Sequence, residues 1–382
     1  MLALVSAWAA RDPIYRKSPN IGDRFIEDAV VWQLRVSGGL TEEFHFFCSR
    51  NDLKPEHLAV INKCRALILC GSTMFHRDFW PKRVKLVRNL ASIKVPIVSF
   101  GCGWGGRLSE TEYQFRPKAR QALARLARNF PMLSVRDAPT KRLIEQQVPK
   151  AQGRVHLTGC PVLFRYNSGV FDPVGLSGGP GKFEPRRILF SSNERFHLRE
   201  HHDLLRRLLD LFPEAEITIA LNEESDEFTS TLSHCPRVRI FSSRRVEDYY
   251  EVLDSHDFQI GFRLHNHMYF LSRCKPTLTV EVDGRTSGFA ETFAQTNLKI
   301  EEIAQLDHLG IRVLLQENAS HLPATAAPRW TEMKRLIEAI GNLPHAVGPG
   351  FVKRLFYRFC FPIDGGESQV RKQGIQICQR AE

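Results

Sequence analysis

The sequence predicts two α/β domains, each built on a parallel sheet covered by helices, and three observations support this fold class. The chain has 382 residues, which is too long for one ordinary hydrophobic core. Strand-like and helix-like apolar runs alternate along both halves. A Gly- and Pro-rich stretch without periodicity, residues 166–187, separates them. We therefore expect an N-terminal α/β domain over residues 1–165, this linker, a C-terminal α/β domain over residues 188–328, and a C-terminal helix with a basic tail over residues 329–382.

The first half opens with a short apolar run, residues 1–10, that lacks a basic segment before it. This favours a buried first strand over a signal peptide. Asp23 is placed to cap a helix whose apolar residues recur at helical spacing as far as Leu34. The remaining expected elements are strands at 65–71, 95–100, 131–137 and 155–161, and helices at 82–91, 116–128 and 140–147.

The second half repeats this alternation. Its expected strands lie at 187–191, 216–221, 238–241, 258–261 and 276–280, and its helices at 201–211, 246–253 and 264–274. Asp283-Gly284-Arg285 reads as a turn. Residues 323–328, rich in Pro and Ala, predict a spacer before a helix at 330–340, and the tail from Phe351 is aromatic and basic.

The charge balance favours an anionic ligand. Lys and Arg number 53 against 42 Asp and Glu, which gives a formal net charge of +11. The basic residues are scattered and no nucleic-acid-binding motif accompanies them, so a small anionic substrate or an acidic membrane surface fits better than nucleic acid. No stretch approaches the roughly 20 apolar residues of a membrane span.

The cysteines predict neither disulfides nor a metal site. There are nine, an odd number, and none forms a C-x-x-C pair. Most lie within apolar runs, which indicates buried, reduced thiols. The chain also lacks H-E-x-x-H, and its His pairs have no ligand-like surroundings, so we expect no metal.

The most informative stretch is 257–268, in which a short buried strand ends on Gly261 and leads at once into an apolar helix. Arg263 and His265 lie at the start of that helix, where backbone N–H groups and the helix dipole favour negative charge. An Arg side chain suits phosphate or carboxylate, and a His side chain can move a proton near neutral pH. The alternative is a solvated Arg263 and a capping His265.

Other strands also end on glycine or polar residues, including Gly101 and the pair Arg136-Asp137. In open α/β sheets such strand ends border the ligand-binding crevice. A local surface salt bridge is the alternative interpretation of the Arg136-Asp137 pair.

Gly101 to Gly106 fits G-x-G-x-x-G, but it follows a later strand and Asp137 lies far beyond the usual acidic position, which disfavours a dinucleotide. The sequence contains neither a P-loop motif nor a G-x-S-x-G nucleophile elbow.

Taken together, these segments resemble the polysaccharide pyruvyltransferase family over about residues 18–295. The likeness is carried by Asn20-Ile21-Gly22-Asp23, by the glycine loop at 98–106, by Ser134-Val135-Arg136-Asp137 and by Arg263-Leu264-His265. The chain departs from the family pattern at Cys70-Gly71-Ser72, at Trp104-Gly105-Gly106 and at residues 158–161, where many members have Asp-Pro.

The resemblance implies two glycosyltransferase-B-like domains facing a cleft, and transfer of a pyruvyl group from phosphoenolpyruvate to a sugar, without a cofactor. It implies that Arg263 and Arg136 bind the phosphate and carboxylate of phosphoenolpyruvate, and that His265 is the general acid/base. Acceptor binding or support is implied for Asn20, Asp23, Asp137, Gly101 and Gly103.

Two other functions stay open: a nucleotide-sugar-dependent glycosyltransferase of the same architecture, and a non-catalytic sugar- or lipid-binding relative. The implied setting is exopolysaccharide or cell-envelope synthesis in the cytoplasm. A lipid-linked acceptor and peripheral contact with the inner face of an anionic membrane also stay open, as do the acceptor sugar and the ketal ring size.

Overall fold

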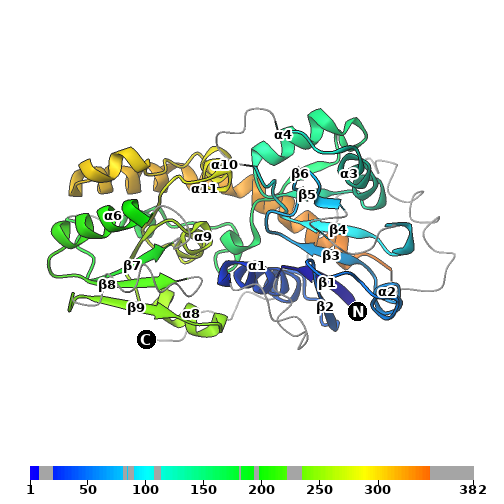
Figure 1. Ribbon diagram of the computed structural model, residues 1–382, viewed down its shortest axis with the longest axis horizontal. Coiled ribbons are helices and arrows are strands. Elements are labelled where there is room, and N and C mark those ends of the chain that lie inside the picture. Colours follow the sequence, from blue (N-terminus) through cyan, green and yellow to red (C-terminus); the bar gives the residue numbers. More distant parts are fainter. Residues whose placement is uncertain are drawn as a thin grey trace, which may run out of the picture. The chain divides into compact units, whose positions relative to one another are not determined.

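The computed structural model describes residues 1–7, 20–80, 84, 90–106, 113–179, 182–192, 198–221 and 235–344. All of these residues belong to one compact unit, Met1–Ala346 (Figure 1). The predicted basic tail, with Lys353, Arg354 and Arg358, lies outside the described residues, as does most of the helix expected at 82–91.

The first half contains a parallel sheet with strand order β2-β1-β3-β4 and a parallel pair, β5-β6. An isolated parallel bridge between Cys102 and Val135 connects the end of β4 to β5. The strands are β1 (Leu2–Ser6), β2 (Phe44–Cys48), β3 (Leu67–Cys70), β4 (Ile97–Phe100), β5 (Leu133–Val135) and β6 (Val155–Leu157), and the helices are α1 (Ile21–Trp32), α2 (Pro55–Ile61), α3 (Pro117–Asn129) and α4 (Ala138–Gln147).

The second half is a five-stranded parallel sheet with order β11-β10-β7-β8-β9. Strand β10 lies inside the sheet between β11 and β7, and the helix that follows it, α9, is buried along its whole length. The strands are β7 (Arg187–Ser192), β8 (Glu216–Leu221), β9 (Val238–Ser242), β10 (Phe258–Gly261) and β11 (Thr277–Thr279), and the helices are α6 (Leu198–Leu211), α8 (Val246–Asp254), α9 (Leu264–Ser272) and α10 (Gly284–Phe293).

Each sheet has its own hydrophobic core. Buried apolar side chains from β1, β3, β4 and α3 belong to one cluster, and those from β7, β8, β10 and α6 belong to the other. The predicted α/β class with parallel sheets in both halves is therefore confirmed. The predicted domain boundaries stay predictions, and the linker range contains the short helix α5 (Pro173–Ser177).

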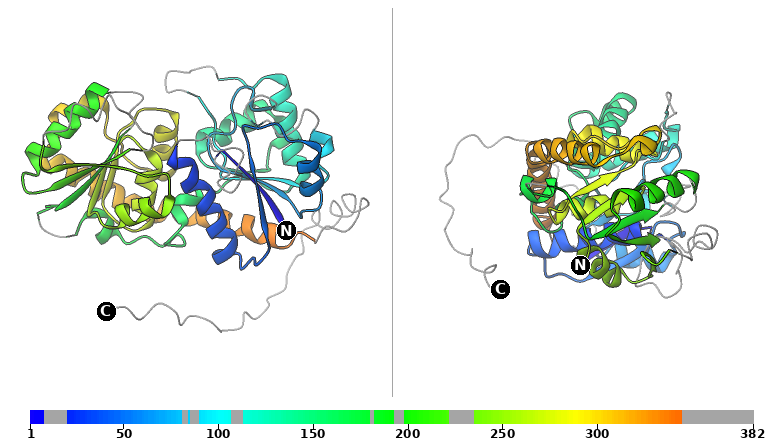
Figure 2. Two further views of the ribbon diagram at one scale, coloured as in Figure 1. Left: turned by 60° about the horizontal axis from the view of Figure 1, so that its bottom comes forward. Right: turned by 90° about the vertical axis from the view of Figure 1, so that its left-hand side faces the viewer.

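Helix α11 (His308–Gly341) corrects one prediction. The Pro- and Ala-rich residues 323–328 do not form a spacer, because Pro323 and Pro328 lie inside this continuous helix. Its earlier part contacts the second half through Asn318 and Thr296, and its end is bound by Arg65, which precedes β3. Figure 2 shows the last turns of α11 in orange near the blue N-terminal strand. Tertiary contacts at both ends thus override the local effect of proline.

Strand β2 and helix α2 were not predicted. Phe44 to Cys48 is an apolar run interrupted by His45, and this edge strand is only partly buried. The first strand, by contrast, is completely buried as β1, as expected. The seven cysteines among the described residues are free thiols, five of them buried, as predicted. No helix in the described part of the chain is long and apolar enough to span a membrane.

Candidate active site

The turn from β10 to α9 requires glycine. Gly261 has a φ of 146°, and a Cβ atom there would lie 2.4 Å from the carbonyl oxygen of Ser191 on β7. The chain can therefore turn sharply and bring Arg263 to the N-cap position of α9. The Arg263 backbone N–H donates to Ser191 Oγ (3.3 Å), and its Nε donates to the carbonyl oxygen of Ser192 (2.6 Å). Arg263 is thus a buried, anchored cation and not a solvated loop residue.

His265 is the second residue of α9 and is 8% exposed. Its Nε2 atom is buried and has no hydrogen-bond partner among the described residues. Burial is the main cause that lowers the pKa of His265, to about 3, and the charges of Arg136, Arg285 and Arg263 lower it further. The imidazole is therefore neutral at pH 7 and faces several cations.

His267 differs from His265 in its surroundings. Its Nδ1 lies 2.9 Å from Thr277 Oγ1, and burial alone lowers its pKa to about 3. Its ring also packs edge-on against Phe289. These contacts agree with a structural role inside the second half.

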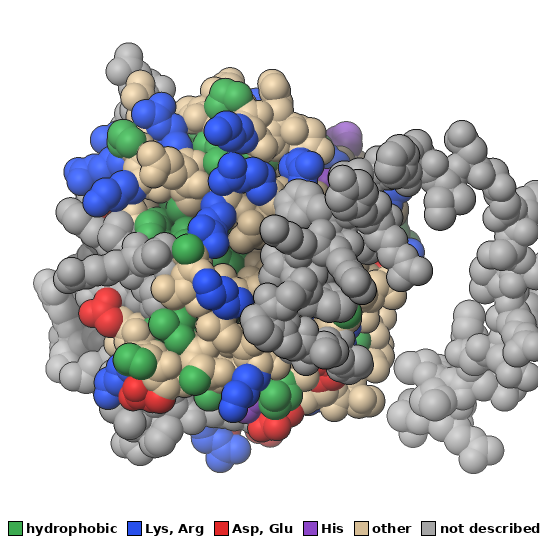
Figure 3. All heavy atoms as spheres, turned by 90° about the vertical axis from the view of Figure 1, so that its right-hand side faces the viewer, with side chains coloured by type: hydrophobic (Ala, Val, Ile, Leu, Met, Phe, Trp, Pro, Cys, Tyr) green, Lys and Arg blue, Asp and Glu red, His purple; other side chains and the backbone are tan. Residues whose placement is uncertain are grey.

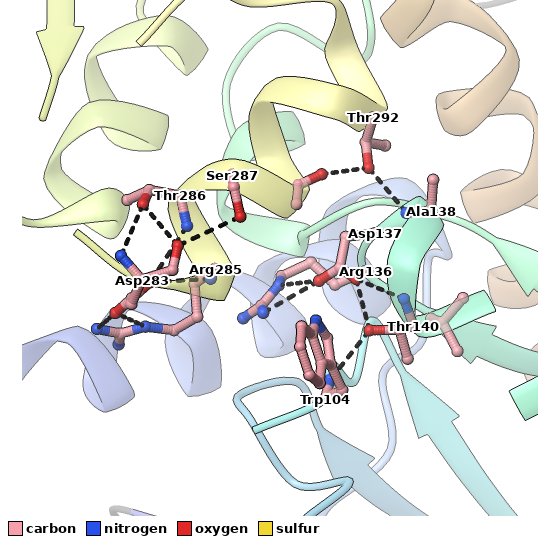
Figure 4. Close-up of polar contacts among 12 residues, drawn as sticks. Trp104, Arg136, Asp137, Ala138, Thr140, Asp283, Arg285, Thr286, Ser287 and Thr292 are labelled. Atoms are coloured by element: carbon pink, nitrogen blue, oxygen red, sulfur yellow. Dashed lines mark hydrogen bonds and ion pairs between the residues drawn. The ribbon is translucent and has the colours of Figure 1, made fainter. Parts of the chain in front are cut away.

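Arg136 and Asp137 follow β5 and are 2% and 1% exposed, so the alternative of a surface salt bridge is wrong. Arg136 Nε donates to Asp137 Oδ2 (3.1 Å), and Nη2 lies at ion-pair distance from the same oxygen, also 3.1 Å. Nη1 is buried without a partner among the described residues. Asp137 Oδ1 accepts hydrogen bonds from Thr140 N (2.9 Å) and Thr140 Oγ1 (2.5 Å), which caps α4 (Figure 4).

The glycine loop after β4 packs against this pair. A Cβ atom on Gly103 would lie 2.4 Å from Arg136 Nη2, so the absent side chain leaves room for the guanidinium group. Gly101 has a φ of 65°, and its N–H donates to Ser134 Oγ (2.8 Å). Trp104 N donates to Thr140 Oγ1 (2.9 Å), which ties the loop to the start of α4 (Figure 4). Gly103 therefore makes room for the Arg136 side chain, and Gly101 allows the backbone of the loop to turn beside Gly159.

The start of α1 differs from the prediction in one respect. The helix is capped by Asn20, whose side chain accepts a hydrogen bond from Gly22 N (2.9 Å), and not by Asp23. Asp23 lies in the first turn, where Ser72 Oγ donates to it (3.3 Å) and Arg50 forms an ion pair with it (3.5 Å). The expected cap at Asp23 was wrong because Asn20 already supplies the capping oxygen.

Two residues of this region were missed. Asp283 caps α10 by accepting hydrogen bonds from the backbone N–H groups of Arg285 (2.8 Å) and Thr286 (3.2 Å), so the expected turn is the start of a helix. The Arg285 side chain binds the same carboxylate. The sequence did contain a signal for these two residues, namely a capping Asp soon after a strand end, followed by Arg. This signal resembles the Gly-x-Arg pattern before α9.

Helix α10 lies against the first half. Ala138 N donates to Thr292 Oγ1 (2.8 Å), as Figure 4 shows, and Arg142 binds Glu291. A Cβ atom on Gly288 would lie 3.3 Å from the carboxyl carbon of Asp137. The structure therefore brings Arg136 and Asp137 of one half to α10 of the other, and Arg136 and Arg263 to within electrostatic range of His265.

In the described part of the chain, no group of three or more His, Cys, Asp and Glu residues is arranged to hold a metal ion. The unpartnered buried atoms include the Arg136 guanidinium nitrogens, which are cationic donors and suit an anion.

Comparison with known proteins gives a family match. A sequence-family model described as polysaccharide pyruvyl transferase matches residues 20–284, which is most of the chain. A search of curated protein sequences finds no match.

Solved structures show the fold. The S. aureus MnaA–UDP co-structure is similar with a TM-score of 0.55 at 13% sequence identity, over 91% of this chain and 99% of that one. A UDP-GlcNAc 2-epimerase from Methanocaldococcus jannaschii has a TM-score of 0.50 at 9% identity, over 88% of this chain and 99% of that one. At such identities the likeness shows the fold alone, and that fold is glycosyltransferase-B-like, as predicted.

Proposed function

Because the chain belongs to the polysaccharide pyruvyl transferase family, we propose that it transfers a pyruvyl group from phosphoenolpyruvate to a sugar and forms a cyclic ketal. The observation that carries this proposal is the set of buried donors near His265. Arg136 Nη1 and His265 Nε2 are both buried without a partner among the described residues. Such atoms are costly unless a ligand completes their hydrogen bonds.

Phosphoenolpyruvate has the chemistry to satisfy these donors. It carries a phosphate and a carboxylate, and we propose that the buried guanidinium groups of Arg263 and Arg136 each bind one anionic group. Asp137 has both oxygens engaged, by Thr140 and by Arg136, so its role in this proposal is to hold Arg136 rather than to bind the acceptor. We propose that the carboxylate of Asp23 binds hydroxyl groups of the acceptor. Asn20 caps the helix that carries Asp23.

His265 is the general acid/base of the proposed reaction. In the free protein its imidazole is neutral, because burial and neighbouring cations lower its pKa. A bound, multiply charged donor neutralises those cations and raises the pKa, so the imidazole gains a proton when the donor binds. The proton is thus supplied in the complex, where it is needed.

The proposed reaction takes place in two steps. His265 protonates the methylene carbon of the enol to give a methyl group, a first sugar hydroxyl attacks the oxocarbenium-like carbon, and its proton returns to the imidazole. A second hydroxyl then attacks the same carbon, the C–O bond to phosphate breaks, and the proton of that hydroxyl leaves with phosphate. The products are a pyruvate ketal and inorganic phosphate, and no cofactor is needed.

The proposed acceptor is a sugar of a polysaccharide or of its lipid-linked precursor, used at the cytoplasmic side of a membrane. Helix α3 supports peripheral contact with an anionic surface. It has no acidic residue, Lys118, Arg120 and Arg128 are exposed, and its apolar side is already buried in the core. Figure 3, viewed from the side of Figure 1 where α3 lies, shows more basic than acidic side chains. Salt-sensitive sedimentation with anionic vesicles, absent with neutral ones, is the expected result.

The decisive experiment incubates the protein with phosphoenolpyruvate and candidate sugars. We expect phosphate release that requires both substrates and a product whose mass has increased by one pyruvyl ketal. A parallel incubation replaces phosphoenolpyruvate with nucleotide sugars. Glycosyl transfer there, with phosphoenolpyruvate ignored, would establish the nucleotide-sugar alternative, and sugar binding without turnover of either donor would establish a non-catalytic relative.

A further inference from the structure

Arg285 lies in the first turn of α10, which packs against the proposed donor site. A Cβ atom on Gly284 would lie 3.0 Å both from the carbonyl oxygen of Gly106 and from the ring of Trp104. One turn later, Gly288 lies against Asp137, the residue that holds Arg136. The first turn of α10 is therefore docked on the glycine loop and on the Arg136-Asp137 pair.

The guanidinium group of Arg285 is held by one carboxylate. Nε donates to Asp283 Oδ2 (2.8 Å) and Nη2 contacts the same oxygen (Figure 4). Nη1 makes no hydrogen bond to any residue that the structure describes. The side chain is 30% exposed, so Nη1 stays accessible to a ligand.

Arg285 interacts electrostatically with His265 of the second half and with Asp23 of the first half. Its positive charge lowers the pKa of His265, second only to Arg136 among the cations. The negative charge of Asp23, on α1, acts to raise the pKa of Arg285 itself, after the larger effects of burial and Asp283. The charge of Arg285 is thus coupled to the proposed acid/base and to the first turn of α1.

We propose that Arg285 is a third donor-binding guanidinium group, whose Nη1 binds the phosphate of phosphoenolpyruvate, and that Asp283 is the positioning residue that aims it. This inference rests on the proposed function. Near neutral pH the phosphate carries most of two negative charges and the carboxylate carries one. A third guanidinium group matches that total, and it retains the phosphate as the C–O bond breaks.

A purely structural role for Arg285 makes a different prediction. If its side chain only closed the first turn of α10, then losing it would lower stability and leave anion affinity unchanged. The distinction can be measured by equilibrium binding of two probes, phosphoenolpyruvate and inorganic phosphate, to the full chain. Arg285→Met removes the charge, Arg285→Lys keeps the charge without the planar group, and Asp283→Asn keeps a capping oxygen while weakening the hold on Arg285.

The matched control is Arg142→Met. Arg142 also bonds a carboxylate at α10, that of Glu291, but this pair is exposed, and Glu291 is the bonded partner of Arg142 among the described residues. Its loss is expected to leave both affinities unchanged. Thermal unfolding of every variant separates lost binding from lost folding.

The expected result is that Arg285→Met weakens both probes by about 10- to 100-fold, with a partial effect for Arg285→Lys and for Asp283→Asn. Equal affinity of wild type and Arg285→Met would overturn the inference and leave the proposed function standing. Weaker phosphoenolpyruvate binding with unchanged phosphate binding would assign Arg285 to the carboxylate and overturn the phosphate assignment. A wild-type protein that binds neither probe would overturn the proposed donor site, and this inference with it.

Discussion

Arg136 Nη2 occupies the space that a side chain at Gly103 would need, since an added Cβ atom would lie 2.4 Å from it. The guanidinium group is also bound by Asp137 and buried, so it cannot move aside without losing these contacts. The glycine loop therefore sets the position of a cation that the proposed reaction depends on.

Gly103→Ala is accordingly expected to weaken phosphoenolpyruvate binding by at least about 10-fold, because the displaced Arg136 loses its alignment. Calorimetric titration of the purified variant measures this. Gly341→Ala is the matched control, because its Cβ would meet its nearest neighbour, Leu40, at an ordinary 3.7 Å. Unchanged donor affinity in Gly103→Ala would show that Arg136 is not a donor ligand.

His265→Gln is expected to lower kcat by about 10²- to 10⁴-fold, because the variant lacks a group that can carry the proton. Phosphoenolpyruvate should still bind, since the guanidinium groups remain. Phosphate release under saturating donor measures the first quantity, and titration measures the second. His267→Gln is the control within the same helix, and near-normal turnover in His265→Gln would eliminate the assigned role.

The depressed pKa of His265 also predicts how stability depends on pH. The folded pKa of about 3 lies below the ordinary value of 6.5, so between these values the unfolded chain binds a proton that the folded chain excludes. Folding stability is therefore fully present above pH 6.5 and falls as the pH is lowered toward 3. His267 adds a contribution of the same sign.

Urea unfolding at pH 7.5 and pH 5 measures this loss. The drop in the free energy of unfolding should be smaller in His265→Gln than in wild type by about 2 kcal/mol. From pH 6.5 to pH 5, about 1.5 pH units, only the unfolded wild-type chain binds a proton at His265, and each pH unit contributes about 1.4 kcal/mol. Identical drops in the two proteins would mean that His265 can be protonated in the folded state. Added phosphoenolpyruvate should reduce the drop in wild type, because the proposed donor complex accepts that proton.

The sequence pattern identified the strand ends and their charged residues because these depend on local features. A buried strand, a glycine and an Arg-x-His run are contiguous at 258–265. The arrangement of Arg136 over Gly103 was not predictable, because the parallel bridge between Cys102 and Val135 brings together segments that are 33 positions apart in the sequence. The need for small residues there is visible only in three dimensions.

Arg285 was missed for a different reason. Asp283-Gly284 is typical of a turn, and Gly disfavours helices, so the run did not read as the start of α10. In the structure Asp283 satisfies the first free N–H groups, which allows the helix to begin at Gly284. Helix α11 was predicted as a spacer followed by a shorter helix for a related reason. Its two prolines disfavour a helix locally, and the tertiary contacts that stabilise the helix cannot be read from the sequence.

Those contacts can be tested at Arg65, which binds the end of α11. Its Nη2 donates to the carbonyl oxygens of Ile340 (3.2 Å) and Gly341 (2.6 Å), and its Nη1 forms an ion pair with Glu42. The side chain is buried, so Arg65→Met would leave several buried acceptors without donors. We expect a loss of about 2–4 kcal/mol in the free energy of unfolding, measured in urea, with phosphoenolpyruvate affinity unchanged at temperatures where the variant is folded.

Arg335→Met, which removes an exposed ion pair with Glu332 on the same helix, should cost less than about 1 kcal/mol. Equal costs for the two variants would mean that the end of α11 does not depend on Arg65.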